Sequence, residues 1–261
     1  MTVFPSHAPG TFSWVELATI DQPAAVAFYR TLFGWGLNEY PMGPDEVYSM
    51  LQLRGLDVAA AYTMRGNERE SGVPPHWNLY ITVAAVDEAV KQAQALGATV
   101  LAPAFDVMDA GRMAVLQDPT GAVFQVWEPR QHIGSQILDE PGALCWTELT
   151  TRDPTAAAAF YTALFGWTAQ HGAPGAVQDY THFTVGGVPS IGMFEMPAEM
   201  PASIPSFWMP YFQVTDVDAS VGTATANGAR VMRPPQALPG TGRFAILADP
   251  QGAAFAVFSQ G

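Results

Sequence analysis

The chain has 261 residues, with 11 Lys and Arg against 24 Asp and Glu, so its formal net charge is −13. This shortage of basic residues argues against nucleic acid and against an anionic membrane surface, because proteins bind both mainly through Lys and Arg. The apolar content of 49% excludes wholesale disorder, yet no apolar run approaches the roughly 20 residues of a membrane span. The start of the chain lacks the pattern of a secretory signal, and Cys145 is the only cysteine. We therefore expect a cytoplasmic protein without an intramolecular disulfide.

An internal repeat divides the chain. The segment 9–35 lines up with 141–167, which lies 132 residues later, and the Asp-Pro-x-Gly sequence at 118–121 recurs at 249–252. Self-similarity over a whole module indicates a tandem duplication. It predicts two modules and a linker, at residues 1–130, 141–261 and 131–140.

Each module divides again into units of a strand, a helix and further strands. In the first unit, alternation predicts a strand at 14–19, and Asp21 and Gly34 bound a helix at 23–33. Strands are expected next at 47–53 and 58–64. The second unit repeats this order with a strand at 78–83, a helix at 87–96 and strands at 99–102, 112–117 and 122–127. The helices of the second module are predicted at 154–165 and 217–226.

Four such units, paired two by two, resemble the vicinal oxygen chelate superfamily, which includes glyoxalase I, extradiol dioxygenases and bleomycin-resistance proteins. An Asp-x-x-x-Ala-x-x-Phe-Tyr helix before Leu-Phe-Gly-Trp and the Asp-Pro-x-Gly turn carry the resemblance, and both occur twice. The pattern is most similar to tandem actinobacterial members described as glyoxalase-like or as hydroxylases. The resemblance implies an α+β fold of two modules, each of paired βαβββ units, with mixed sheets curled into cups and helices outside. The same scaffold supports isomerisation, ring cleavage, thiol transfer and drug sequestration, so it does not decide the activity.

The resemblance also allows a test for metal. Metal-binding members use His, Gln and Glu side chains from the first and last strands of each unit. The motifs place these positions on Trp14, near Ala60, on Asn78 and on Gln125, and in the second module on Trp146, near Gly192, on Met209 and on Ala256. An indole offers only an N–H donor, and two neutral amides make a poor divalent site. We expect no metal of this type and no cofactor; the best remaining chance is His182 with a carboxylate.

Two glutamates are the sharpest chemical feature. Alternation along a strand puts Glu16 on the same face as Trp14, and Glu148 on the same face as Trp146. If this face is the concave one, burial would raise the pKa of each carboxyl group and suit it to general acid or base catalysis. The alternative is structural: each Glu satisfies a backbone N–H or pairs with an arginine, Arg112 or Arg243 respectively.

The same alternation predicts the side chains that line each cup. The first set is Trp14, Glu16, Tyr62, Asn78, Tyr80 and Gln125; the second is Trp146, Glu148, His182, Met209 and Tyr211. Aromatic walls with a few polar groups are typical of a small-molecule pocket, and core packing is the alternative for each aromatic.

Three functional hypotheses follow. The first is a metal-independent protein that binds a small apolar aromatic or polyketide-like metabolite and transforms it by Glu-assisted proton transfer, as an isomerase, cyclase, lyase or cofactor-independent hydroxylase. The second is a non-catalytic resistance or sequestration protein, and the third is a metal-dependent glyoxalase or extradiol-type dioxygenase. In all three the partner is a small molecule, and the packed modules form a monomer or a homodimer.

Overall fold

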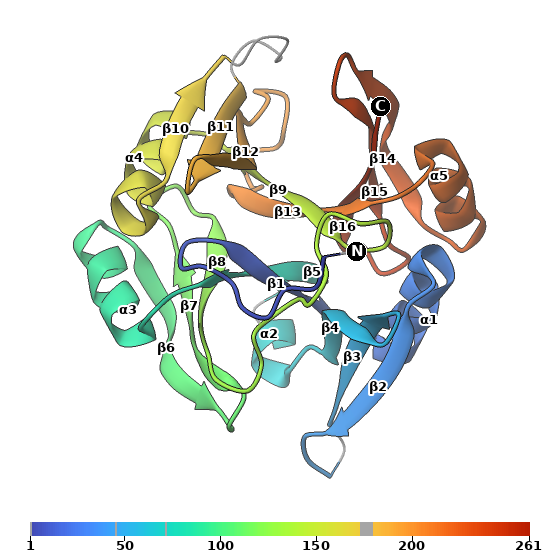
Figure 1. Cartoon of the computed structure of the whole chain (residues 1–261), viewed down its shortest axis with the longest axis horizontal. Coiled ribbons are helices and arrows are strands. Elements are labelled where there is room, and N and C mark those ends of the chain that lie inside the picture. The colour runs from blue at the N-terminus through green and yellow to red at the C-terminus, as the bar shows by residue number, and fades with distance from the viewer. Residues whose placement is uncertain (1, 45, 71, 173–179) are drawn as a thin grey trace.

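The computed structural model describes residues 2–44, 46–70, 72–172 and 180–261 and contains two eight-stranded mixed sheets, one from each module (Figure 1). The first module comprises β1 (Phe12–Thr19), α1 (Gln22–Phe33), β2 (Gly36–Pro41), β3 (Val47–Leu53), β4 (Leu56–Thr63), α2 (Gly66–Glu70), β5 (His76–Thr82), α3 (Val86–Ala95), β6 (Thr99–Val107), β7 (Gly111–Gln117) and β8 (Val123–Pro129). The second comprises β9 (Leu144–Thr151), α4 (Pro154–Phe165), β10 (Thr168–His171), β11 (Tyr180–Val185), β12 (Val188–Glu195), β13 (Phe207–Gln213), α5 (Val217–Ala226), β14 (Arg230–Leu238), β15 (Gly242–Ala248) and β16 (Ala254–Gln260).

The two sheets have the same topology. Their strand orders are β2-β3-β4-β1-β5-β8-β7-β6 and β10-β11-β12-β9-β13-β16-β15-β14. The first strands of the two units, β1 and β5, pair antiparallel at the centre, and each also pairs in parallel with the last strand of its own unit. This arrangement confirms the predicted α+β fold of paired βαβββ units. Among the described residues, no helix is long and apolar enough to cross a membrane.

The first helix of each module lies where it was predicted: α4 has the predicted bounds, and α1 begins one residue earlier, at Gln22. The Asp21 carboxylate accepts a hydrogen bond from the Ala24 N–H, and Gly34 ends α1 in the left-handed conformation at φ 70°. Asp153 and Gly166 bound α4 in the same way, with φ 70° at the glycine. A short polar side chain before a helix and a glycine after it satisfy the unpaired backbone groups of the helix ends.

The structure differs from the predicted elements at the sheet edges. The strands β2 and β10 were not predicted, because β2 is largely exposed and lacks the alternation of a half-buried strand. The strand predicted at 99–102 extends to Val107, beyond Pro103. An edge strand tolerates proline because its outer N–H needs no partner in the sheet.

The two modules are joined by a pair of reciprocal hydrogen bonds. Tyr29 on α1 donates its hydroxyl proton to the Asp249 carboxylate of the second module at 3.1 Å, and Tyr161 on α4 donates to Asp118 of the first module at 2.9 Å. Each tyrosine also accepts a hydrogen bond from a tryptophan Nε1 of its own module, Trp77 at 3.1 Å and Trp208 at 2.9 Å. The two sequence features that carry the resemblance therefore meet across the module boundary.

Further contacts make the space between the sheets one continuous apolar core. Buried residues from the helix-facing side of both sheets, such as Val15 and Leu149, belong to a single cluster. Trp35 donates to the Gly142 carbonyl at 2.7 Å, and Trp167 donates to the Gly10 carbonyl at 2.8 Å. In Figure 1, α1 lies beside α5 on one flank and α3 beside α4 on the other. The helix faces of both sheets are thus covered by the opposite module.

The segment 131–140, predicted as the linker, lies against the first module. The Ser135 N–H donates to the Ser13 carbonyl at 2.6 Å, and the Gln136 N–H donates to the Asp57 carbonyl at 2.8 Å. Gly134 has φ 100°, and a Cβ there would lie 2.5 Å from the Ser13 oxygen. Only glycine permits this close approach. The segment therefore bridges the beginnings of β1 and β4.

We expect the reciprocal tyrosine contacts to hold the modules together. Tyr29→Phe or Tyr161→Phe leaves a buried Trp N–H without its acceptor and should lower the free energy of unfolding by about 1–3 kcal/mol. Urea unfolding followed by circular dichroism measures this, with Tyr40→Phe as the control, because Tyr40 is 44% exposed. Equal stability of the three variants and the parent protein would contradict this role of the contacts.

Candidate functional site

The sheet face turned away from the helices forms a cup in each module. In the first sheet, Trp14 lies opposite Tyr80, and Tyr80 lies opposite Gln125; Glu16 lies opposite Asn78 on one side and Ala60 on the other. Five of these side chains were predicted to line the cup, and their exposed fractions are 3–8%. The exposed fractions of Val15 and Leu17, which face the helices, are 0%. The sheet curls so that both edges lie on the cup side of the central strands (Figure 1).

A chain of four side chains holds the carboxylate of the first cup. Tyr80 donates a hydrogen bond to Glu16 Oε2 at 2.5 Å. Tyr48, on β3, is close enough to Glu16 to oppose the rise of its pKa as a hydroxyl donor, and the Trp14 indole does the same for Tyr48. One phenol therefore binds the carboxylate directly, and a second phenol, next to the indole, supports it.

The second cup repeats this chain. Tyr211 donates to Glu148 Oε1 at 2.7 Å, and Tyr180 donates to Glu148 Oε2 at 2.8 Å. Trp146 donates from Nε1 to the Tyr180 hydroxyl at 3.2 Å. Gly192 makes room for this crossing, because a Cβ there would lie 1.8 Å from the Tyr180 hydroxyl oxygen and 2.7 Å from Trp146 Nε1.

The sequence reasoning missed Tyr48 and Tyr180. Their signal was present, because they lie 132 positions apart, which is the offset of the first repeat. They lie far along the chain from their glutamates, and only the pairing of β3 and β4, and of β11 and β12, brings them to the cup.

The glutamates are the groups of these chains that ionise most readily. Burial raises the pKa of Glu16 above its ordinary value, and the hydroxyl donors Tyr80 and Tyr48 oppose this shift. Burial likewise raises the pKa of Glu148 against the donors Tyr211 and Tyr180. Burial and the nearby carboxylate hold the pKa of the tyrosines well above the usual range, so these hydroxyls stay protonated.

The remaining predicted residues of the first cup form a second polar chain. Gln125 Nε2 donates to Asn78 Oδ1 at 2.7 Å, Asn78 Nδ2 contacts the Tyr62 hydroxyl at 3.4 Å, and Tyr62 donates to Glu68 Oε1 at 2.8 Å. Gln125 Oε1 is buried and, among the described residues, has no hydrogen-bond partner. A buried amide oxygen without a donor is costly, which indicates that a ligand or solvent group donates to it.

The second cup is more apolar. Met209, Tyr211 and Ala256 pack in one cluster with partly buried Trp146 and Phe258. His182 lies in the same register row as Glu148, separated from it by Gly192. Its ring centroid is 4.8 Å from that of Tyr180 and 5.9 Å from that of Trp146. Burial lowers the pKa of His182, so the ring is neutral at pH 7.

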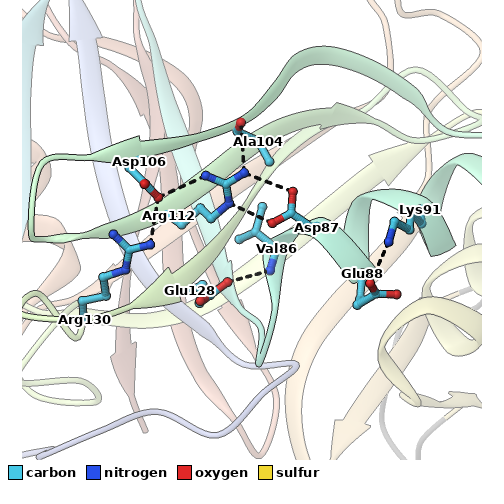
Figure 2. A network of polar contacts seen from close by, with 9 residues as sticks. All are labelled: Val86, Asp87, Glu88, Lys91, Ala104, Asp106, Arg112, Glu128 and Arg130. Carbon is cyan, nitrogen blue, oxygen red and sulfur yellow. Dashed lines mark hydrogen bonds and ion pairs between the residues drawn. The ribbon is translucent and has the colours of Figure 1, made fainter.

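The suggested pairing of the cup glutamates with Arg112 and Arg243 is wrong. Arg112 binds Asp87 at 2.9 Å and Asp106 at 3.1 Å, and Figure 2 shows it enclosed by these carboxylates beside Arg130. Arg243 binds Asp218 at 2.7 Å. Both arginines fasten the start of a helix to the neighbouring strands. Glu128 also serves that region by accepting from the Val86 N–H, since Ala85 cannot cap α3 with its side chain.

Two open depressions lie outside the cups. One, of about 240 Å³, lies between the modules beside α3 and the end of α4; the other, of about 500 Å³, lies along α1. Their ionisable side chains, Glu88 and Arg30, are engaged with Lys91 and with the Trp35 carbonyl. Neither depression gathers groups that could carry out a reaction.

Comparison with known proteins agrees with this architecture. The family model of the Glyoxalase/Bleomycin resistance protein/Dioxygenase superfamily matches residues 11–126 and 143–257. The chain belongs to this superfamily. It is 45% identical over 252 residues to the "Putative glyoxylase CFP32" of Mycobacterium tuberculosis (strain CDC 1551 / Oshkosh), covering 96% of this chain and 95% of that protein. It is 32% identical over 262 residues to the "Anthracycline biosynthesis protein DnrV" of Streptomyces peucetius, covering 96% and 93%.

Solved structures share the fold. The Mn(II)-bound glyoxalase from Novosphingobium aromaticivorans superposes with a TM-score of 0.66 at 14% identity, covering 96% of this chain and 82% of that one. The 2,3-dioxygenase LapB from Pseudomonas sp. KL28 superposes with a TM-score of 0.64 at 15% identity, covering 100% and 94%. These likenesses confirm the predicted fold.

The residues of the cups do not fit the metal that some members of the superfamily hold. Within the described ranges, no group of three or more His, Cys, Asp and Glu side chains comes together. Glu16 is accompanied by two amides, Asn78 and Gln125, and Glu148 has one imidazole, His182, and the thioether of Met209 in its row. Divalent metals of this kind are held by several imidazoles and carboxylates, so we derive no step through a metal.

The raised pKa of the cup glutamates should appear in the pH dependence of stability. The unfolded chain loses these protons near the ordinary value of 4.5, before the folded protein does, so ionisation costs stability as pH rises through that window. Unfolding by urea between pH 4 and 8 should therefore show Glu16→Gln and Glu148→Gln gaining stability relative to the parent protein as pH increases. Glu39→Gln, on the exposed strand β2, is the control. A difference that does not change with pH would contradict the raised pKa.

Substitution of Gly192 tests separately whether the Tyr180–Glu148 hydrogen bond stabilises the protein. Gly192→Ala should displace the Tyr180 hydroxyl from Glu148 and lower the free energy of unfolding by about 1–3 kcal/mol. Combining it with Tyr180→Phe in a double-mutant cycle should give less than the sum of the two effects, because both remove the same hydrogen bond. Ala60→Gly, at the matched position of the first cup, is the control for the effect of an alanine–glycine exchange on stability. Full additivity would show that Gly192 acts by another route.

Proposed function

We propose that this superfamily member is metal-independent, binds a small, largely apolar aromatic or polyketide-like metabolite in its cups, and transforms it by proton transfer to and from a glutamate. The observation that carries this proposal is the duplicated chain of Trp, Tyr, Glu and Tyr. A nearly buried carboxylate with a raised pKa, beside an indole, combines a proton acceptor with a surface on which a flat ring packs.

The geometry leaves the carboxylate free to react. A carboxylate offers about four lone-pair sites, and the two tyrosines occupy one each. In the second cup Tyr211 binds Oε1 and Tyr180 binds Oε2, so each oxygen keeps one site for a ligand. The ionised Glu148 can take a proton from an acidic C–H or O–H group of the ligand and return it elsewhere, which suits isomerisation, cyclisation or elimination.

The ligand class is supported by the lining and by one relative. Trp14, Tyr80 and Trp127 form a buried aromatic cluster in the first cup, and Met209, Tyr211 and Phe244 line the second. DnrV is named for anthracycline biosynthesis, and anthracyclines are flat polycyclic aromatic compounds. A planar aromatic metabolite would match the surfaces of both cups.

A non-catalytic sequestration protein is the second candidate. The same two hydrogen bonds that orient each glutamate also satisfy it structurally, as expected if the carboxylate only positions a ligand. Binding and proton transfer therefore have to be measured separately.

The test uses 2-tetralone, a bicyclic aromatic ketone with acidic C1 protons, in D₂O. If a cup glutamate removes a C1 proton to form the enolate and returns a deuteron, mass spectrometry detects exchange above the buffer rate. Glu16→Gln with Glu148→Gln should reduce this rate by about 10²–10⁴-fold, because a general base is lost. Quenching of tryptophan fluorescence by 2-tetralone should remain, since glutamine keeps the shape of the site.

Each of the other possible outcomes of this experiment distinguishes between the functional hypotheses. Quenching without catalysed exchange by the parent protein would support sequestration. Exchange that the double glutamine variant retains would remove the glutamates from the mechanism. Exchange abolished by a chelator and restored by a divalent metal would favour a metal-dependent glyoxalase or dioxygenase. Glu39→Gln serves as the matched control because Glu39 is exposed on β2.

A further inference from the structure

The two cups differ along one matched row of residues. Residues directly opposite one another on paired strands share a sheet face. The row of the first cup is Trp14, Tyr80, Gln125, Val115 and Ala102, and that of the second is Trp146, Tyr211, Ala256, Ile246 and Arg233. The aromatic half of the row is preserved. In the other half, Ala256 of the second cup replaces the Gln125 amide, and the Arg233 guanidinium replaces Ala102.

Arg233 is directed at the second cup. Its Cζ lies 5.8 Å from the centroid of the Phe244 ring, and Phe244 packs with Tyr211 and Met209 in the cup cluster. The guanidinium is close enough to Glu148 to lower the pKa of its carboxyl group in opposition to burial. Register, ring contact and electrostatics therefore agree on the side to which this arginine points.

Arg233 also lacks an anionic partner. Among the described residues, no carboxylate forms an ion pair with it, whereas Arg112, Arg130 and Arg243 are each bound to an aspartate. Arg30 and Arg152 also have no carboxylate partner among the described residues, but they donate to backbone carbonyls, whereas Arg233 is exposed beside the cup. Guanidinium groups bind planar carboxylates through two parallel hydrogen bonds, so an anionic ligand would supply the missing partner.

The first cup carries more negative charge than the second. It holds a second carboxylate, Glu68, which accepts from Tyr62 at 2.8 Å and raises the pKa of Glu16. Arg65 acts on Glu16 in the other direction, but it forms an ion pair with Glu46 at 4.0 Å. Phe194 replaces Tyr62 at the matched position of the second cup, opposite Tyr180. The first cup thus offers acceptors, including the unpaired Gln125 oxygen, and suits a ligand that donates hydrogen bonds.

We infer that the second cup selects a planar organic anion, bound through its negative charge by Arg233 and through its ring by Trp146 and Phe244, whereas the first cup takes a neutral, hydrogen-bond-donating ring. This inference rests on the proposed function, since it assigns the ligand class of one of the two proposed sites. It makes the duplicated protein a pair of related sites that divide ligands by charge.

The experiment compares 2-naphthoate with its neutral isostere 2-naphthamide by tryptophan quenching at low salt. Arg233→Ala should weaken 2-naphthoate binding about tenfold or more, the loss expected for a charge-assisted hydrogen bond, and leave 2-naphthamide within about twofold. Arg230→Ala, an exposed arginine on the same strand, is the matched control and should change neither. Arg233→Lys should retain part of the affinity, because it keeps the charge but loses the planar fork.

A gain-of-function variant completes the test. Ala102→Arg places a guanidinium at the matched position of the first cup and should restore 2-naphthoate binding in the Arg233→Ala protein. Unchanged 2-naphthoate affinity in Arg233→Ala would overturn the charge selection while leaving the proposed aromatic binding intact. Failure of the parent protein to bind either probe at millimolar concentration would instead overturn the proposed function, and this inference with it.

Discussion

The structure depends on one carboxylate in each Asp-Pro-x-Gly turn. One oxygen of Asp249 accepts the backbone N–H groups of its own turn, from Gln251 and Ala253, while the other accepts the Tyr29 hydroxyl of the opposite module. Asp118 does the same for its turn and for Tyr161. The turn and the module contact therefore form together. Because this contact buries the helix faces of both sheets in one core, the opposite faces form the cups, which open away from each other (Figure 1).

The duplication preserves the buried glutamate and varies its surroundings. Both cups keep a glutamate held by two phenols, although burying a carboxyl group costs free energy that an apolar residue would not. The hydrogen bonds offset part of that cost, and burial still raises the pKa of both carboxyl groups. The neighbouring positions diverge: Gln125 corresponds to Ala256. Under the proposed function, a constant carboxyl group with variable neighbours would keep the chemistry and change the recognition of the ligand.

The sequence predicted the fold because its signals are local. Helix caps, turn residues and strand alternation lie within a few residues of one another, and the repeat displays each of them twice. Alternation also placed Glu16 and Glu148 on the correct face. It could not reveal Tyr48, whose contact with Glu16 depends on how β3, β4 and β1 pair. Arg112 was assigned to the wrong carboxylate for the same reason, since Asp87 meets it only after α3 packs on β7.

In a fold shared with metal enzymes, the carboxylate of each cup is bound by tyrosine hydroxyls. A phenol whose pKa is held well above its usual range presents a proton, not a lone pair, to the carboxylate. A cation at the same oxygen would have to displace that proton donor and would find amides or Met209 in place of further anionic ligands. The hydroxyls thus occupy the carboxylate in a way that favours proton transfer over cation binding. Under the proposed function, proton transfer in such a cup depends on how acidic the ligand is, so the charge of the ligand is a property by which the two cups can differ.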